Sequence, residues 1–201
     1  MSSWSELLDR AQPEEHVAQL YGRDDQLLAR NVGRYATNGL RQGDGVLLIA
    51  IPEHAEAVLQ QLRAESADVA AALDAKRLVI LDARRTLDGF LVDGEPNRRE
   101  FQRMVGDVLE AVRAQSVSGK VRAFGEMVGL LWNDGQCAAA VRLEEYWNEL
   151  LTGSSVSLFC GYPIDIFASG SDHGGLHAVL AAHSHTCAGP STVLTSSRAR
   201  R

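Results

Sequence analysis

Residues 43–54 read Gly-Asp-Gly-Val-Leu-Leu-Ile-Ala-Ile-Pro-Glu-His, and this stretch decides the fold class of the chain. Residues 46–51 are all apolar, with a glycine-rich turn before them and a proline after them. Such an uninterrupted run predicts a strand that is buried on both faces, in the middle of a sheet. Pro52 can open a helix, and apolar residues then recur at helical spacing over residues 55–62. The stretch therefore predicts a strand, a tight turn and a helix.

The rest of the chain repeats this alternation of strands and helices. Further strands are predicted where short apolar runs are bounded by turn residues, at residues 16–21, 77–82, 120–128 and 156–162. Further helices are predicted from apolar residues at helical spacing, over residues 3–11, 28–39, 69–73, 101–112, 140–151 and 176–183. The order predicts an α/β fold with three layers, in which helices cover both faces of a mainly parallel sheet.

The bulk properties of the 201-residue chain fit a single globular domain with its own core. A formal net charge of −6 argues against broad binding to nucleic acid, which depends on clusters of lysine and arginine. There is no apolar run of membrane-spanning length and no signal-like start, so we expect a cytoplasmic protein that does not contact a membrane. Three widely separated cysteines predict no disulfide framework.

Polar and reactive side chains follow several of the predicted strands. In a parallel sheet the carboxyl ends of the strands border the ligand crevice, and this places one group of residues at that edge: Tyr21, Glu53, His54, Asp82, Glu126, Cys160 and Tyr162. Each residue also has a simpler interpretation. Glu53 could be a first-turn acid that the helix dipole favours, Glu126 could be a carboxylate bonded to a neighbouring loop, and Cys160 could be a small core residue.

The turn after the first predicted strand argues against ATP chemistry by the usual phosphate-loop route. Residues 22–26 contain one glycine, no lysine and two aspartates, whereas a phosphate loop is rich in glycine and carries a lysine. Arg23 could meet an anion or could simply lie on the surface.

Histidines and cysteines near the end of the chain raise the question of a metal. His183, His185 and Cys187 follow one another at two-residue spacing, and with Cys160 they could in principle bind a soft metal ion. The spacing matches none of the strong zinc patterns, and His183 falls on the apolar stripe of a predicted helix. The sequence therefore predicts no metal site and names no cofactor.

Several segments together resemble the MEDS family, the methanogen and methylotroph DcmR-type sensory domain. They are residues 16–21 with the acidic turn after them, 43–50, 78–83, 123–128, 160–163 and 183–185. The resemblance covers about residues 15–190, which leaves an N-terminal extension at 1–14 and a flexible basic tail at 191–201. It implies a RecA/KaiC-like core without a Walker A loop, and it places His16, Tyr21, Glu126, Cys160 and His183 on characteristic positions.

The resemblance also implies a function. Members commonly precede histidine kinase, PAS or DNA-binding modules in prokaryotic signalling proteins, and are thought to sense small hydrocarbon derivatives. Because this sequence carries no such module, we expect it to act on a histidine kinase or transcriptional regulator in trans, or through self-association.

We therefore predict a non-catalytic sensory domain that binds a small molecule. The residues predicted to bind it are His16, Tyr21, Glu53, His54, Glu126, Cys160, Tyr162 and His183. Two alternatives stay open. One is a ligand-free interaction domain, and the other is an enzyme, either a degenerate nucleotide hydrolase or a thiol-dependent catalyst that uses Cys160 with His183 or Glu126.

Overall fold

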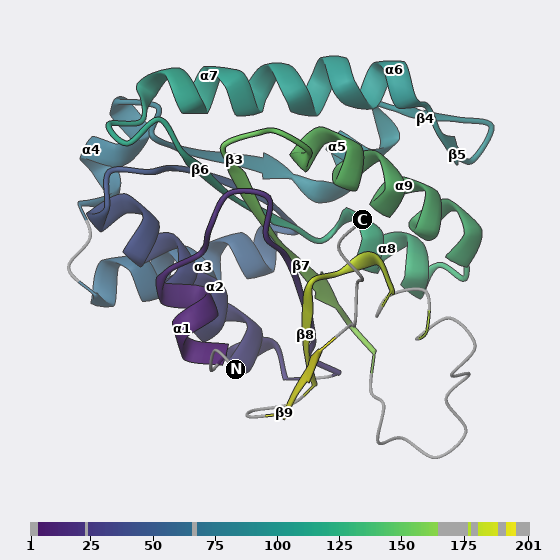
Figure 1. The fold of residues 1–201 in the computed structure, drawn as a ribbon, viewed down its shortest axis with the longest axis horizontal. Helices are drawn as coiled ribbons and strands as arrows, with labels where there is room; N and C mark the ends of the chain where they lie inside the picture. Colours follow the sequence, from purple (N-terminus) through teal and green to yellow (C-terminus); the bar gives the residue numbers. More distant parts are fainter. Residues whose placement is uncertain are drawn as a thin grey trace.

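The computed structural model describes residues 4–22, 24–65, 68–164, 177, 181–188 and 192–195. Its main feature is a seven-stranded sheet with the strand order β3-β2-β6-β7-β1-β8-β9, in which only β9 runs antiparallel to its neighbour (Figure 1). Helices flank this sheet, so the predicted three-layer α/β fold is confirmed. Arg23 and residues 176 and 178–180 of the last predicted helix lie outside the described residues.

The strands of the main sheet are short. They are β1 (His16–Leu20), β2 (Gly45–Ala50), β3 (Leu78–Asp82), β6 (Val121–Gly125), β7 (Val156–Tyr162), β8 (His185–Ala188) and β9 (Thr192–Thr195). The strand β2 is buried throughout, as predicted, but it lies second from the edge of the sheet and β7 is the central strand. An apolar run cannot distinguish these positions, because a strand on each side and a helix layer on each face bury both equally.

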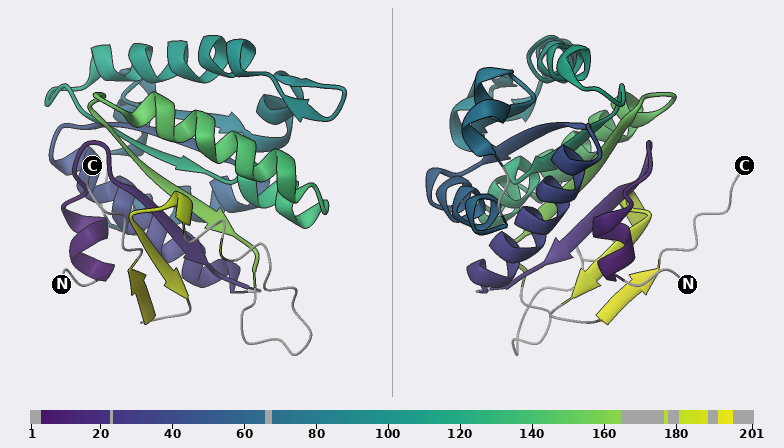
Figure 2. Two further views of the ribbon diagram at one scale, coloured as in Figure 1. Left: turned by 45° about the vertical axis from the view of Figure 1, so that its right-hand side comes forward. Right: turned by 90° about the vertical axis from the view of Figure 1, so that its left-hand side faces the viewer.

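The helices form two layers on opposite faces of the sheet (Figure 2). One layer contains α1 (Trp4–Asp9), α2 (Asp25–Arg41), α3 (Pro52–Ala64) and α4 (Val69–Asp74). The other contains α5 (Ala83–Asp88), α6 (Arg98–Phe101), a π-helical segment (Gln102–Gly106), α7 (Asp107–Gln115), α8 (Met127–Asn133) and α9 (Cys137–Leu151). Side chains alternate between the two faces along each strand, so Leu47 and Ile49 pack in the second layer, and Val46 and Leu48 in the first.

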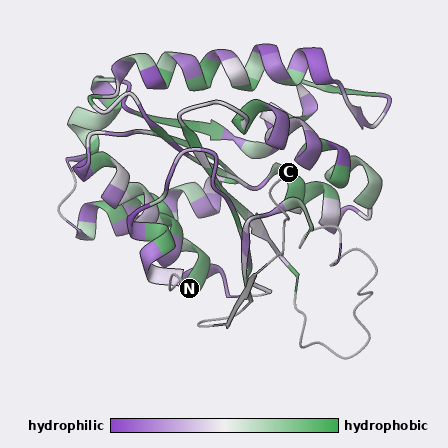
Figure 3. Cartoon of the chain, viewed as in Figure 1, coloured by the Kyte–Doolittle hydropathy of each residue, from purple (hydrophilic) through white to green (hydrophobic). Residues whose placement is uncertain are grey.

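The pattern of hydropathy follows this layering. In Figure 3 the strands of the sheet are mostly hydrophobic, whereas the helices carry hydrophobic and hydrophilic residues on different faces. Within the described part of the chain, none of the helices combines the length and the apolar character that a membrane span requires.

Some predicted boundaries are wrong. The strand predicted over residues 120–128 ends at Gly125, and α8 begins at Met127, because the apolar residues that follow are spaced to bury one face of a helix. His183 was expected on a helical stripe but lies between a helical turn and β8. The sequence analysis also missed α5 and a hairpin of β4 (Leu91–Val92) and β5 (Glu95–Pro96).

Segments outside the predicted domain join the fold as well. The predicted extension at 1–14 contains α1, which packs on α2, and the predicted tail at 191–201 contains β9, which pairs with β8. The division into an extension, a sensory domain and a flexible tail stays a prediction.

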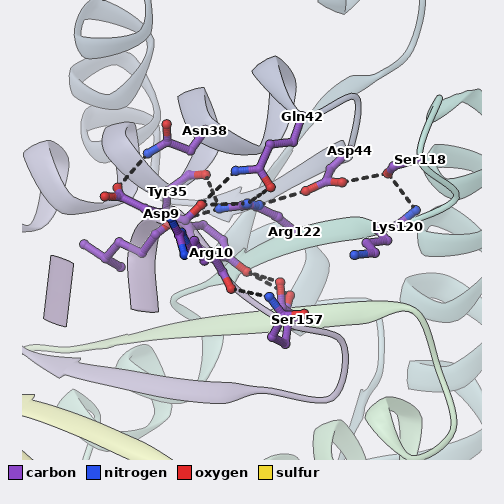
Figure 4. Close-up of polar contacts among 12 residues, drawn as sticks. Asp9, Arg10, Tyr35, Asn38, Gln42, Asp44, Ser118, Lys120, Arg122 and Ser157 are labelled. Carbon is purple, nitrogen blue, oxygen red and sulfur yellow. Dashed lines mark hydrogen bonds and ion pairs between the residues drawn. The ribbon is translucent and has the colours of Figure 1, made fainter. Parts of the chain in front are cut away.

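A buried arginine connects the first helix layer to the sheet. Arg122 of β6 is 1% exposed, and its guanidinium forms an ion pair with Asp44, with 2.9 Å between Nε and Oδ2. It also donates hydrogen bonds to the main-chain oxygens of Leu8 at 2.8 Å and Tyr35 at 3.2 Å, and to the side chain of Gln42 at 3.0 Å (Figure 4). One cation thus holds α1, α2 and the turn before β2 against the sheet.

Candidate functional site

The structure divides the eight predicted binding residues into two groups. Tyr21, Glu53, His54 and Glu126 lie at or beyond the carboxyl ends of β1, β2 and β6, and we call these residues together with Asp25 the edge group. His16, Cys160, Tyr162 and His183 lie between the sheet and α9, and we call these residues together with Glu144 the buried group. Tyr162 ends β7, as predicted, but the residues expected together at this edge fall into two groups.

Asp82, also expected at that edge, has a structural role. It is the N-cap of α5, and its carboxylate accepts a hydrogen bond from the backbone N–H of Arg85 at 2.8 Å. Such a cap satisfies a helix donor that has no partner within the helix.

The edge group is a chain of hydrogen bonds that starts on the backbone. The N–H of Ile51, directly after β2, donates to Glu126 Oε2 at 2.7 Å. Nδ1–H of His54, in the first turn of α3, donates to Glu126 Oε1. On the other side of the imidazole, Nε2 lies 3.5 Å from Asp25 Oδ1 of α2. The ring of Tyr21 contacts the ring of His54 edge to face, with 5.9 Å between the centroids.

This environment shifts the pKa values of two members of the edge group. Burial disfavours the charged form of His54, but the hydrogen bond and charge of Glu126 and the charge of Asp25 outweigh it, so the pKa of His54 is raised. Burial and then the charges of Glu126 and Asp25 raise the pKa of Tyr21. The edge group therefore favours an imidazolium between two carboxylates, beside a neutral phenol.

A cavity of about 650 Å³ opens beside the edge group, between the N-terminal part of α2 and α3. Asp25 and His54 line it, and the other lining residues are Gln26, Ala29, Arg30, Ile51, Glu53, Ala57, Gln60 and Gln61. Amide, carboxylate and imidazole groups thus alternate with small apolar surfaces. This is the composition of a pocket that orients a small molecule by a few polar contacts.

The N-terminus of α2 is not available to a phosphate. The carboxylate of Asp24 caps it by accepting a hydrogen bond from the backbone N–H of Leu27 at 2.8 Å. A negative group therefore occupies the place where a phosphate loop would present its backbone donors.

The buried group joins residues that are far apart in the sequence. His16 begins β1, Cys160 belongs to β7, His183 precedes β8 and Glu144 comes from α9, and all of them are at most 3% exposed. His16 Nε2 lies 3.3 Å from Cys160 Sγ and 3.2 Å from Glu144 Oε2. His183 Nε2 lies 3.3 Å from Glu144 Oε1, and the hydroxyl of Tyr162 donates to the same oxygen.

The electrostatics of the buried group centre on Glu144. Burial disfavours its charge, but the charges of His183 and His16 and the hydrogen bonds from His183 and Tyr162 outweigh burial and lower its pKa to about 2. Burial and the charge of Glu144 raise the pKa of the Cys160 thiol well above its ordinary value. Without a further cation, the group therefore holds a carboxylate and a protonated thiol.

Glu144 and Asn148 of α9 were missed by the sequence analysis. A signal was present for Glu144, because it is spaced four residues after Ala140 and three before Trp147, both on the buried face of the helix. A carboxylate on an apolar stripe needs a buried partner.

The residues proposed for a soft metal near the end of the chain do not gather as the spacing suggested. Cys187 is buried against the first helix layer, on the face of the sheet opposite Cys160. His185 begins β8 and is half-buried. Of the four, only Cys160 and His183 lie together, and they do so with His16 and Glu144.

Comparison with known proteins identifies one family. The sequence model of MEDS, described as the MEthanogen/methylotroph, DcmR Sensory domain, matches residues 15–184. This range begins one residue before His16 and ends one residue after His183, so it contains both groups. No curated protein matches the chain.

Proposed function

Because the chain belongs to the MEDS family of sensory domains, we propose that it binds a small organic molecule in the cavity between α2 and α3 and signals to a separate protein. The molecule is neutral or cationic, carries a hydrogen-bond donor, and is small enough to be a simple hydrocarbon derivative. The partner is a histidine kinase or a transcriptional regulator, which would read the change at α2 and α3 in trans.

The observation that carries this proposal is the hydrogen-bonded chain Asp25–His54–Glu126 at the wall of the cavity. Its inner end is fixed, because both oxygens of Glu126 are bonded and the side chain is 4% exposed. Its outer end is open, because the side chain of Asp25 is 65% exposed. A ligand can therefore bind at Asp25 and His54 without breaking the inner contacts.

The charges of the cavity wall indicate the kind of ligand. Asp25 and Glu53 place two carboxylates on the wall, and Arg30 and the imidazolium favoured at His54 place two cations there. Asp25 is the exposed end of the chain, and it would repel a phosphate or carboxylate group at about 4 Å by on the order of 1 kcal/mol per charge pair even in water. Alcohols and amines, which donate hydrogen bonds to carboxylates, are favoured.

Two observations favour binding over catalysis. The acidic cap on α2 leaves no cradle for a nucleotide triphosphate. A catalyst built on Cys160 would need a thiolate within reach of a substrate, but the thiol is fully buried and its pKa is raised. Its predicted partner Glu126 belongs to the edge group and bonds His54 instead.

Ligand-observed NMR tests the proposal with methanol, methylamine and trimethylamine as probes, the amines being protonated at neutral pH. We expect saturation transfer from the protein to at least one probe. The variant Ala57→Phe, which fills the cavity from α3, abolishes that transfer. The control Arg85→Ala changes a separate cavity of about 520 Å³ near β3 and leaves the transfer intact. Equal transfer in all three proteins would place the ligand elsewhere, and no transfer to any probe would favour a ligand-free interaction domain.

A further inference from the structure

We infer that His16, Glu144, Cys160 and His183 bind one divalent transition-metal ion, of which zinc fits the donor set best. Each of these residues offers one ligand atom, and the four atoms lie within 4.8 Å of one another. The set is two imidazole nitrogens, one thiolate sulfur and one carboxylate oxygen. Zinc accepts all three kinds of ligand, whereas magnesium and calcium prefer oxygen alone.

Two distances within the buried group are close to the edges of a coordination tetrahedron. Bonds of zinc to nitrogen, oxygen and sulfur are about 2.0–2.3 Å long, and the edges of a tetrahedron are about 1.6 times its centre-to-corner distance, which gives ligand separations of about 3.3–3.7 Å. His16 Nε2 lies 3.3 Å from Cys160 Sγ and 3.2 Å from Glu144 Oε2, and all four ligand atoms lie within 4.8 Å of one another. Small movements of these side chains would make room for an ion between them.

A hydrogen bond behind His16 holds its ring in the form that can bind a metal. Nδ1–H of His16 donates to Asn148 Oδ1 at 3.1 Å. Exchanging the oxygen and nitrogen of the Asn148 amide would break a second hydrogen bond, because Nδ2 donates to the main-chain oxygen of Ala182 at 3.2 Å. The proton of a neutral His16 is therefore on Nδ1, and the lone pair of Nε2 points at the other ligands. Metal-binding histidines usually have such a partner.

The carboxylate has a supporting contact too. The hydroxyl of Tyr162 donates to Glu144 Oε1, so Oε2, which faces His16, is the oxygen better placed to bind the ion. The ring of Tyr162 also contacts the ring of His183 edge to face, with 5.8 Å between the centroids. Tyr162 thus positions two of the four ligands.

The charges balance when the site is filled. One dication, one thiolate, one carboxylate and two neutral imidazoles sum to zero, which a site at most 3% exposed requires. Filling the site releases the thiol proton of Cys160, and any proton on the imidazole nitrogens that bind the ion, to solvent. With four protein ligands the coordination shell is closed, which is typical of structural zinc rather than catalytic zinc.

Such an ion would connect segments that the sequence keeps far apart. It would link the start of β1, the centre of β7, the middle of α9 and the segment before β8. Within the sheet, β8 pairs with β1 on the side opposite to β7. The ion would therefore fasten the outer part of the sheet to the core.

The test uses the full chain, refolded in the presence of Zn²⁺ or Co²⁺ because the site is buried, and then dialysed. We expect about one metal ion per chain by mass spectrometry. The Co²⁺ form shows a thiolate-to-metal charge-transfer band and the intense d–d bands of tetrahedral cobalt. Cys160→Ser loses the charge-transfer band. Cys187→Ser and Cys137→Ser, which change the other two cysteines, keep it.

X-ray absorption on the zinc form of the unaltered chain tests the inference without a variant that could fail to fold. We expect one sulfur neighbour at about 2.3 Å and three nitrogen or oxygen neighbours at about 2.0–2.2 Å. His54→Ala, which changes the edge group, leaves the metal content and this spectrum unchanged. A chain that refolds without retaining metal, a zinc shell without sulfur, or a charge-transfer band that survives in Cys160→Ser would each overturn the inference. The group would then be a proton-sharing cluster.

Discussion

Replacing Arg122 by methionine tests how much the buried cation contributes to the fold. The change keeps most of the aliphatic chain but removes the ion pair with Asp44 and the hydrogen bonds to α1 and α2. Asp44 is 3% exposed and would keep one nearby partner, the hydroxyl of Ser118, which donates at 2.6 Å. The variant therefore leaves a carboxylate buried without a compensating charge.

The expected loss is about 3–5 kcal/mol of the free energy of unfolding, which is the usual effect of breaking a buried ion pair by removing one partner. For a protein of this size, about 1 kcal/mol shifts Tm by about 2–4 °C, so Tm falls by about 6–20 °C. Arg63→Met is the matched control, because Arg63 pairs with Glu56 at 3.2 Å while both side chains are 55% exposed. A surface pair of this kind contributes about 0–1 kcal/mol.

Urea unfolding followed by circular dichroism and tryptophan fluorescence measures both variants, and coincident transitions establish two-state behaviour. Changing both partners, in Arg122→Met with Asp44→Leu, removes the uncompensated charge as well. We expect the loss of unfolding free energy in the double variant to be smaller than the sum of the losses in the two single variants. The reasoning would be refuted if Arg122→Met lost less than about 1 kcal/mol of unfolding free energy while the dependence of that free energy on urea concentration stayed unchanged. A loss that small is typical of a solvent-exposed ion pair, not of a buried one.

Three further substitutions test other contacts. Gly129→Ala brings a Cβ to 2.5 Å from the main-chain oxygen of Gly161, so α8 must move away from β7, and we expect a loss of about 1–3 kcal/mol in the urea experiment. Asp24→Ala removes the cap of α2 and should lower stability by about 0.5–2 kcal/mol, with no change in the cobalt spectrum. The raised pKa of His54 stabilises the folded protein, fully below about pH 6.5, and this stabilisation is lost as pH rises through the pKa of His54 in the folded state. His54→Gln should therefore remove this pH dependence of the free energy of unfolding. A wild-type stability that does not fall over that range, or falls equally in the variant, would exclude the imidazolium beside Glu126.

The edge group shows what the sequence could predict. Glu126 follows β6 and His54 follows β2, and the two strands are neighbours in the sheet. Because parallel strands end at a common edge, two polar residues that follow buried strands were expected at one place, and the structure brings them into contact. The role of this contact in ligand binding stays a prediction.

The buried group shows why the rest could not be predicted. Bringing His16 to Cys160 requires knowing that β1 pairs with β7 and that both side chains point to the face covered by α9. Sequence patterns give the period of a strand but not its neighbour. His183 and Glu144 depend on the same information, because one lies before β8 and the other on the helix above the pair.

The two groups lie on opposite faces of the sheet. The backbone N–H of Tyr21 donates to the main-chain oxygen of Tyr162 at 3.0 Å, but the side chain of Tyr162 packs in the second helix layer and that of Tyr21 in the first. The sheet therefore lies between a small molecule beside His54 and the side chains of the buried group. If the proposed ligand and the proposed metal influence each other, we expect β1 and β7 to transmit the effect. The strand β7 contributes Cys160 and Tyr162, and every residue of β1 pairs with it. The proposed ion would hold β1 and β7 together on the face covered by α9, whereas α2 and α3 cover the other face. If the ion stiffens these strands, we expect ligand binding to move α2 and α3 more than the strands beneath them.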